Sequence, residues 1–188
     1  MRWIGLVFWL AICFAVAGIG GRWTSGEIAG WYRTLKRPTI APPNWVFGPV
    51  WTLLYALMAV AAWRVWLAAP SPARTCALSL FAGQLALNLA WSWIFFSRHA
   101  IGAALVEIWV LWVAIGATML SFSRLEPIAA WLMAPYLAWV TFAGALNAAF
   151  WRLNLGWLVA AAGRALRGMS EKTAIEPHRN AKRPNSLP

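Results

Sequence analysis

The chain has 188 residues, of which 62% are hydrophobic and 11% are charged, and its formal net charge is +11. This composition excludes an ordinary soluble domain and is typical of an integral membrane protein. The basic excess has no nucleic-acid motif beside it, so we expect no nucleic-acid partner. The sequence contains no Asp, which excludes a Ser-His-Asp triad. Its two Cys and two His lack metal-ligand spacing, so we expect no disulfide framework and no metal site.

Five stretches are long and apolar enough to cross a bilayer, which takes about 20 mostly apolar residues. They cover residues 3–20, 45–67, 76–97, 100–123 and 127–151. The first stretch has a second interpretation as a cleavable signal peptide, because Arg2 precedes it and a small-residue triplet ends its apolar core. Its Trp and Phe content and its glycine-rich end favour a retained helix. The short apolar run 153–163 is predicted to be a frayed or interfacial extension.

The longest predicted connection, residues 21–44, is a candidate lid. Pro38, Pro42 and Pro43 stiffen it, and long loops in compact folds are often functional. Lys and Arg are more frequent on the lid's side of the membrane, which predicts a bacterial inner-membrane protein with its N-terminus outside and its C-terminus in the cytoplasm. The outer membrane is the alternative. We predict a transmembrane domain over residues 1–154 and an extension with a basic, disordered cytoplasmic tail over residues 155–188.

Polar and aromatic side chains recur on single faces of the predicted helices, because residues three or four apart share a face. These faces contain Trp51 and Tyr55; Gln84, Asn88, Trp91 and Phe95; Glu107; and Tyr136, Trp139, Ala143 and Asn147. Turned inward together, they predict an apolar, tryptophan-lined pocket with a few hydrogen-bonding groups. The alternatives are interhelical hydrogen bonds for the amides, a protonated structural carboxyl for Glu107, and ordinary core packing for the rings.

Small residues form another face of the third predicted helix. They are Ser79, Ala82, Gly83, Ala86 and Ala90. Such patterns allow membrane helices to approach closely. This face predicts either tight packing within one chain or a homodimer contact.

Four segments carry a resemblance to a known family: "RPTIAPPNWVFGPVWTLLYALM", "GQLALNLAWSWIFF", "ALVEI" and "PYLAWVTFAGALNAAFWRLN". They resemble the translocator protein family, also called tryptophan-rich sensory proteins or peripheral benzodiazepine receptors, over about residues 3–154. The resemblance implies an all-α bundle of five transmembrane helices, often a homodimer, with an internal ligand cavity closed by the loop between the first two helices. It also implies protoporphyrin IX, haem, cholesterol or benzodiazepine-type molecules as ligands, with no required cofactor.

The resemblance assigns ligand-binding positions residue by residue. They are Trp51, Tyr55, Asn88, Trp91, Glu107, Trp139, Ala143, Leu146 and Asn147. We add Arg33, Lys36, Arg37 and Ile40 as lid residues, with the basic ones as partners for porphyrin propionates. Ile40 stands where the family has a Trp implicated in porphyrin handling, which argues against photochemistry through that position. The family's proposed cholesterol motif is also broken, because Phe150 and Trp151 precede Arg152 where a Tyr is needed.

The favoured function is a membrane receptor or carrier that binds tetrapyrroles and related hydrophobic ligands, in the bilayer and as a homodimer. The alternative is an enzyme-like, light-dependent degradation of protoporphyrin IX. A third hypothesis is a proton-coupled exporter with Glu107 as the titrating group, although no inverted repeat is evident.

Overall fold

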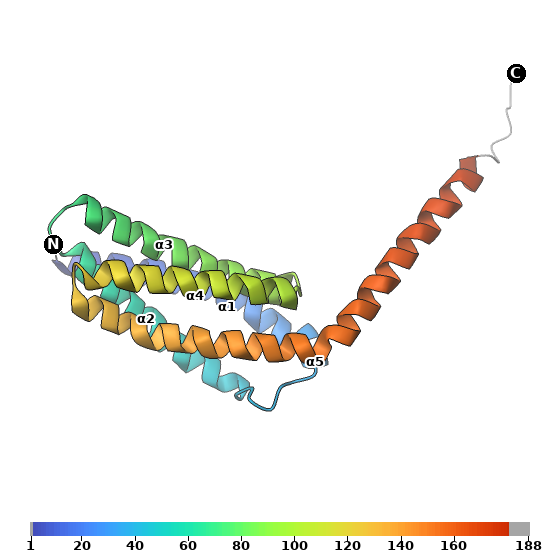
Figure 1. Cartoon of the computed structure of the whole chain (residues 1–188), viewed down its shortest axis with the longest axis horizontal. Coiled ribbons are helices and arrows are strands. Elements are labelled where there is room, and N and C mark those ends of the chain that lie inside the picture. Colours follow the sequence, from blue (N-terminus) through green and yellow to red (C-terminus); the bar gives the residue numbers. More distant parts are fainter. Residues whose placement is uncertain (1, 181–188) are drawn as a thin grey trace, which may run out of the picture. The chain divides into compact units, whose positions relative to one another are not determined.

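The computed structural model describes the backbone of residues 2–180 and the side chains of residues 3–156. The chain divides into two units, Met1–Trp151 and the part that begins at Arg152. The first unit is a bundle of α1 (Arg2–Ile28), α2 (Phe47–Trp66), α3 (Pro72–Ser92), α4 (Ile101–Ser123) and the first part of α5 (Pro127–Asn180), which lie side by side in Figure 1. Short helices η1 (Trp31–Thr34), η2 (Asn44–Val46) and η3 (Trp93–Ser97) connect them.

Five helices of the described chain are long and apolar enough to cross a membrane. They are Trp3–Ile28, Asn44–Trp66, Pro72–Ser97, Ile101–Ser123 and Pro127–Gly156. The protein is therefore a multi-pass, all-α membrane protein, as the sequence predicted. Large apolar side chains on the outside, such as Trp3, Val113 and Trp131, are what a lipid-facing surface requires.

The first helix is longer than the sequence predicted. It continues past Gly20 to Ile28, so the connection to α2 begins eight residues later than expected. The segment contains no proline before Pro38, and the Thr24 hydroxyl donates to the Gly20 carbonyl oxygen at 3.0 Å, a bond that fits helical backbone. The helix packs against α2 and α3, so it is an integral part of the bundle.

Two local signals explain where α3 begins and ends. Ser71 is its N-cap and accepts the Arg74 backbone N–H at 3.2 Å, and Pro72 follows at the first helical position. At its other end the helix widens into the π-helical turn η3, in which the Arg98 N–H donates to the Trp93 carbonyl oxygen at 3.0 Å. π-Helical turns are rare in proteins, but those that occur are often found at functional sites.

The second unit is described by its backbone alone from Trp157 onward. Its helix continues to Asn180, where the sequence analysis expected an extension and a disordered tail. The segment is rich in Ala, Leu and Arg, which favour helix, and Pro177 is its first proline. Residues 181–188, the end of the predicted tail, lie outside the described residues.

Candidate functional site

A pocket of about 370 Å³ opens between the helices at one end of the bundle. Its volume falls in the range of about 300–1,000 Å³ that small-molecule sites occupy. The later half of α1, the first half of α2, the end of α3 with η3, and α5 form its walls, whereas α4 contributes no described lining residue. The lining residues are Phe14, Ala17, Gly20, Gly21, Thr24, Ser25, Ile28, Tyr32, Asn44, Phe47, Gly48, Trp51, Thr52, Tyr55, Asn88, Trp91, Ser92, Phe95, Phe96, Trp139, Ala143, Leu146, Asn147 and Phe150.

Aromatic rings dominate the pocket wall and hold one another in place. The Trp91 ring stacks on Phe95 with centroids 5.2 Å apart, and Trp51 lies 5.5 Å from Tyr55. Trp139 meets Phe47 edge to face at 5.9 Å. Such pairs stabilise each ring in one orientation. The wall therefore presents broad, preformed apolar faces from three different helices.

A buried chain of hydrogen bonds closes the deep side of the pocket. The Tyr55 hydroxyl donates to Asn88 Oδ1 at 2.8 Å, and Asn88 Nδ2 donates to the Tyr136 hydroxyl at 2.9 Å. The chain joins α2, α3 and α5. Because all three side chains are at least 95% buried, these bonds replace water that the groups have lost.

Asn147 makes a second link between helices. Its Oδ1 accepts from Trp91 Nε1 at 3.2 Å, and its Nδ2 donates to the Ile101 carbonyl oxygen at 2.9 Å. Asn88 and Asn147 thus act as interhelical bonding groups while both line the pocket. Each amide keeps one further N–H and one further lone pair, since an amide can make four hydrogen bonds.

The structure brings together every ligand-binding residue proposed from the sequence except Glu107. Trp51, Tyr55, Asn88, Trp91, Trp139, Ala143, Leu146 and Asn147 all line the pocket. Glu107 lies on α4, and its enclosed carboxylate oxygens have no hydrogen-bond partner among the described residues. The amide of Gln84, on the buried side of α3, is likewise without one. The position of Glu107 gives the exporter hypothesis no support.

The lid turns apolar and aromatic side chains inward. Tyr32 and Leu35 are buried, and Tyr32 lines the pocket. Arg33, Lys36, Arg37 and Ile40, the lid residues chosen from the sequence, are exposed and none of them lines the pocket.

Arg37 nevertheless lies close to the pocket mouth. Its guanidinium donates to Asn44 Oδ1 at 3.3 Å and lies 5.8 Å from the centre of the Tyr32 ring, and both of these neighbours line the pocket. Burial raises the pKa of Tyr32 above its usual value, and the Arg37 charge partly offsets this effect. The Tyr32 phenol is therefore neutral at physiological pH, so it does not cancel the positive charge of Arg37.

Sequence reasoning missed the contribution of α1 to the pocket. Its lining positions recur at helical spacing, as one helix face requires, and they are Phe14, Ala17, Gly20, Gly21, Thr24, Ser25 and Ile28. The face became invisible because the helix was expected to end at Gly20. Small and hydroxyl-bearing residues continuing at helical spacing were the available signal.

Comparison with known proteins places the chain among relatives of one family. A family profile described as the TspO/MBR family matches residues 9–152. The chain is 42% identical over 141 residues to the "Translocator protein" of Homo sapiens, covering 74% of this chain and 83% of that protein. It is 39% identical over 153 residues to the "Tryptophan-rich protein TspO" of Chlorobaculum tepidum (79% and 95%). It is 40% identical over 154 residues to the "Tryptophan-rich sensory protein" of Cereibacter sphaeroides (82% and 94%).

Proposed function

Because the chain belongs to the TspO/MBR family, we propose that it is a membrane receptor or carrier whose pocket binds tetrapyrroles, such as protoporphyrin IX or haem, and related hydrophobic molecules. Binding would influence the transport or regulation of these pigments. The porphyrin itself is the ligand, and the proposal requires no additional cofactor.

One observation supports this proposal above the others: Trp51, Trp91 and Trp139 come from three helices and line the same pocket. A flat, mostly apolar macrocycle gains most from broad aromatic faces, because ring pairs add stacking energy to the burial of area. The rings already pack against neighbouring aromatic side chains, so binding would order few of them anew.

Polar recognition would come chiefly from the mouth. The deep amides of Asn88 and Asn147 are each engaged twice within the protein, so each has one donor and one acceptor site left for a ligand. Arg37 contacts the lining residues Asn44 and Tyr32, so it could pair with a propionate through a guanidinium geometry that suits carboxylates. A porphyrin would enter with its apolar edge first and leave its propionates at the lid.

A binding titration in darkness tests the proposal. Adding protoporphyrin IX to the purified protein should quench tryptophan fluorescence with saturation, and Trp139→Phe should weaken binding by removing part of a wall. Trp131→Phe is the control, because Trp131 is 76% exposed on the same helix and does not line the pocket. Quenching that never saturates, or that shifts equally in both variants, would refute the proposal.

The alternative function, light-dependent degradation of protoporphyrin IX with dioxygen as oxidant, has one observation in its favour. Three pocket tryptophans would lie next to an excited macrocycle even though Ile40 replaces the family's loop Trp. Illuminating the complex and following absorbance tests it. A new absorbing product formed faster than from free pigment supports an enzyme, whereas the rate of free pigment dismisses it.

The orientation and oligomeric state also belong to this proposal. With the lid side cytoplasmic, Arg37→Cys in a Cys76→Ser background would react with an impermeant reagent from the cytoplasmic side.

A homodimer would use the small-residue face of α3, whose members Ser79, Ala82, Gly83 and Ala86 are exposed. A Cβ at Gly83 would meet nothing within 4 Å in the chain itself, so Gly83→Leu should dissociate a dimer without disturbing the protomer.

A further inference from the structure

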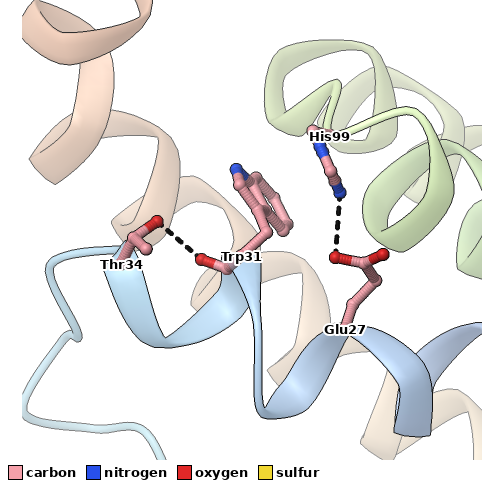
Figure 2. Close-up of polar contacts among 4 residues, drawn as sticks. All are labelled: Glu27, Trp31, Thr34 and His99. Atoms are coloured by element: carbon pink, nitrogen blue, oxygen red, sulfur yellow. Dashed lines mark hydrogen bonds and ion pairs between the residues drawn. The ribbon is translucent and has the colours of Figure 1, made fainter.

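The base of the lid carries a group of three side chains that the pocket does not use (Figure 2). Glu27 comes from the last turn of α1, Trp31 begins η1, and His99 lies in the turn between η3 and α4. His99 Nε2 lies 3.1 Å from Glu27 Oε2, and the Trp31 ring stacks on the imidazole with centroids 4.1 Å apart and planes 16° from parallel. The three side chains join the start of the lid to the end of the α3–α4 hairpin.

The backbone at His99 is held in an unfavourable conformation. Its φ is 54°, and it is the one non-glycine residue of the described chain with a positive φ. Outside glycine this region is sparsely populated and costs free energy, so it persists where surrounding contacts fix it. The turn follows the widened helix η3, and together they place the imidazole between Glu27 and Trp31. The His99 side chain is therefore held in one position by its contacts and does not extend freely into solvent.

Trp31 connects this group to the pocket through its neighbour in the chain. Tyr32 is buried, lines the pocket, and packs against Phe95, Phe96 and Phe150 at 5.4–6.5 Å between ring centroids. The Trp31 indole N–H has no hydrogen-bond acceptor among the described residues, so ring packing fixes Trp31. Its backbone carbonyl oxygen accepts from the Thr34 hydroxyl at 2.7 Å, which keeps η1 wound (Figure 2).

We propose that Glu27, Trp31 and His99 form a clamp that positions Tyr32 over the pocket and thereby sets how fast a bound ligand leaves. This inference rests on the proposed function, because it presumes that the pocket holds a ligand. None of the three clamp residues lines the pocket, although the Trp31 ring meets the lining residue Phe95 edge to face at 5.8 Å. They are therefore positioning residues. Opening the clamp would free the start of the lid while leaving the tryptophan wall intact.

The imidazole of His99 is held by two contacts of different kinds. It shares a hydrogen bond with the Glu27 carboxylate, and its face stacks on the Trp31 indole. Glu27 is the described acidic group within ion-pair distance of His99, and the adjacent Arg98 guanidinium lies 5.4 Å from the centre of the Trp93 ring. Removing either contact is therefore expected to loosen the clamp and speed up ligand release.

The decisive experiment measures the dissociation rate of protoporphyrin IX by stopped flow, with excess unlabelled apo-protein as a trap. Glu27→Ala should release the pigment roughly two- to fivefold faster than the unmodified chain, because a partly exposed ion pair contributes modestly. Glu27→Gln keeps an acceptor for the imidazole and should fall between them. His99→Asn keeps a residue type that tolerates positive φ but loses the stacking on Trp31, and it should release the pigment at least as fast as Glu27→Ala.

Glu126→Ala is the matched control. It removes the Arg64–Glu126 pair, which has a similar length (2.9 Å) and similar exposure but ties α2 to the α4–α5 turn, away from every lining residue. Its release rate should equal that of the unmodified chain. Equal rates for Glu27→Ala and Glu126→Ala, or an unchanged release rate in His99→Asn, would overturn the clamp.

A second measurement keeps the test independent of ligand binding. Hydrogen exchange of the Arg33 and Leu35 amides, which donate to the Gly30 and Tyr32 carbonyl oxygens, should accelerate in Glu27→Ala and stay unchanged in Glu126→Ala. If protoporphyrin IX fails to bind the unmodified chain but this exchange difference is present, the proposed function is wrong and the clamp's control of ligand release falls with it, while its hold on the start of the lid is confirmed. If binding saturates but neither rate changes, the clamp is wrong and the proposed function stands.

Discussion

The two ends of the bundle are built from the same helices but differ in packing: one end is a closely packed core, and the other end contains the pocket. Toward one end, α2 and α5 contribute side chains with no exposed surface, such as Met58, Ala62 and Met133, and α3 and α4 add Phe81 and Phe122. Toward the other end, the same α2 and α5 present half-buried tryptophans to a pocket. Stability and binding are thus separated along each helix, so a change in one half should leave the other largely intact.

The largest expected effect tests the closed end. Phe81 is fully buried, stacks on Phe122 at 5.9 Å and meets Trp9 edge to face at 5.6 Å. Phe81→Ala should cost about 3 kcal/mol in the free energy of unfolding, because it leaves a cavity that the bundle cannot fill. Steric-trap or denaturant unfolding in detergent measures this cost. Ligand affinity of the folded fraction should stay within twofold, and a larger loss would show that the two ends are coupled.

A smaller effect is expected where the pocket end contributes to stability. Asn88→Ala leaves the buried hydroxyls of Tyr55 and Tyr136 without their partner, at a cost of about 2 kcal/mol. Thr118→Val is the control, since that buried hydroxyl bonds within its own helix to the Ala114 carbonyl oxygen. Thermal unfolding compares the two variants. Equal destabilisation would mean that the interhelical chain adds nothing beyond a local bond.

The third prediction alters the pocket without altering the core. A Cβ at Gly21 would meet nothing within 4 Å, and Gly21 lines the pocket, so Gly21→Leu should fill space that a ligand needs. Gly18 has equally open surroundings on the same helix but lies outside the lining, and Gly18→Leu serves as its control. Both should gain helix stability by roughly 0.8 kcal/mol. Only the affinity of Gly21→Leu for protoporphyrin IX should fall, by about tenfold or about 1.4 kcal/mol; parallel losses would place the ligand elsewhere.

The smallest effect concerns the ion pair at the closed end. Glu126→Ala should lower the free energy of unfolding by about 0.5 kcal/mol, because the Arg64–Glu126 pair is one-third exposed and screened by water. Raising the salt concentration should erase the difference between this variant and the unmodified chain. A loss above about 2 kcal/mol would show that the pair is structurally essential instead.

The spans, and a group of pocket residues on α2, α3 and α5, followed from helical spacing. Asn88 and Trp91, and likewise Trp139 and Ala143, share a face in the sequence, and the fold turns both faces to the same pocket. Helical spacing could not distinguish Gln84 from Asn88, because the two lie one turn apart on α3. Gln84 does not line the pocket, and whether it does depends on how α3 is rotated against α4. Glu107 likewise has enclosed carboxylate oxygens but does not line the pocket.

The side-chain positions in the lid and at its base could not be predicted from helical spacing. Charge and family position singled out Arg33, Lys36, Arg37 and Ile40, yet the lid buries Tyr32 and Leu35. Loop side chains are placed by long-range contacts rather than by a regular period. The contact between Glu27 and His99 joins residues 72 positions apart, and no local sequence pattern predicts it.

The widened turn η3 makes the pocket end sensitive to chain length. It accommodates one residue more per turn than an α-helix does, so deleting a single residue between Trp93 and Ser97 would restore regular winding. Because the wide turn absorbs that extra residue, the chain beyond it would keep roughly its direction about the helix axis, whereas the side chains within the turn would be redistributed. Phe95 and Phe96, which line the pocket from this turn, would change their positions in the wall. Substitutions in this turn are thus a matter of chemistry, but its residue count is a matter of geometry that point changes cannot repair.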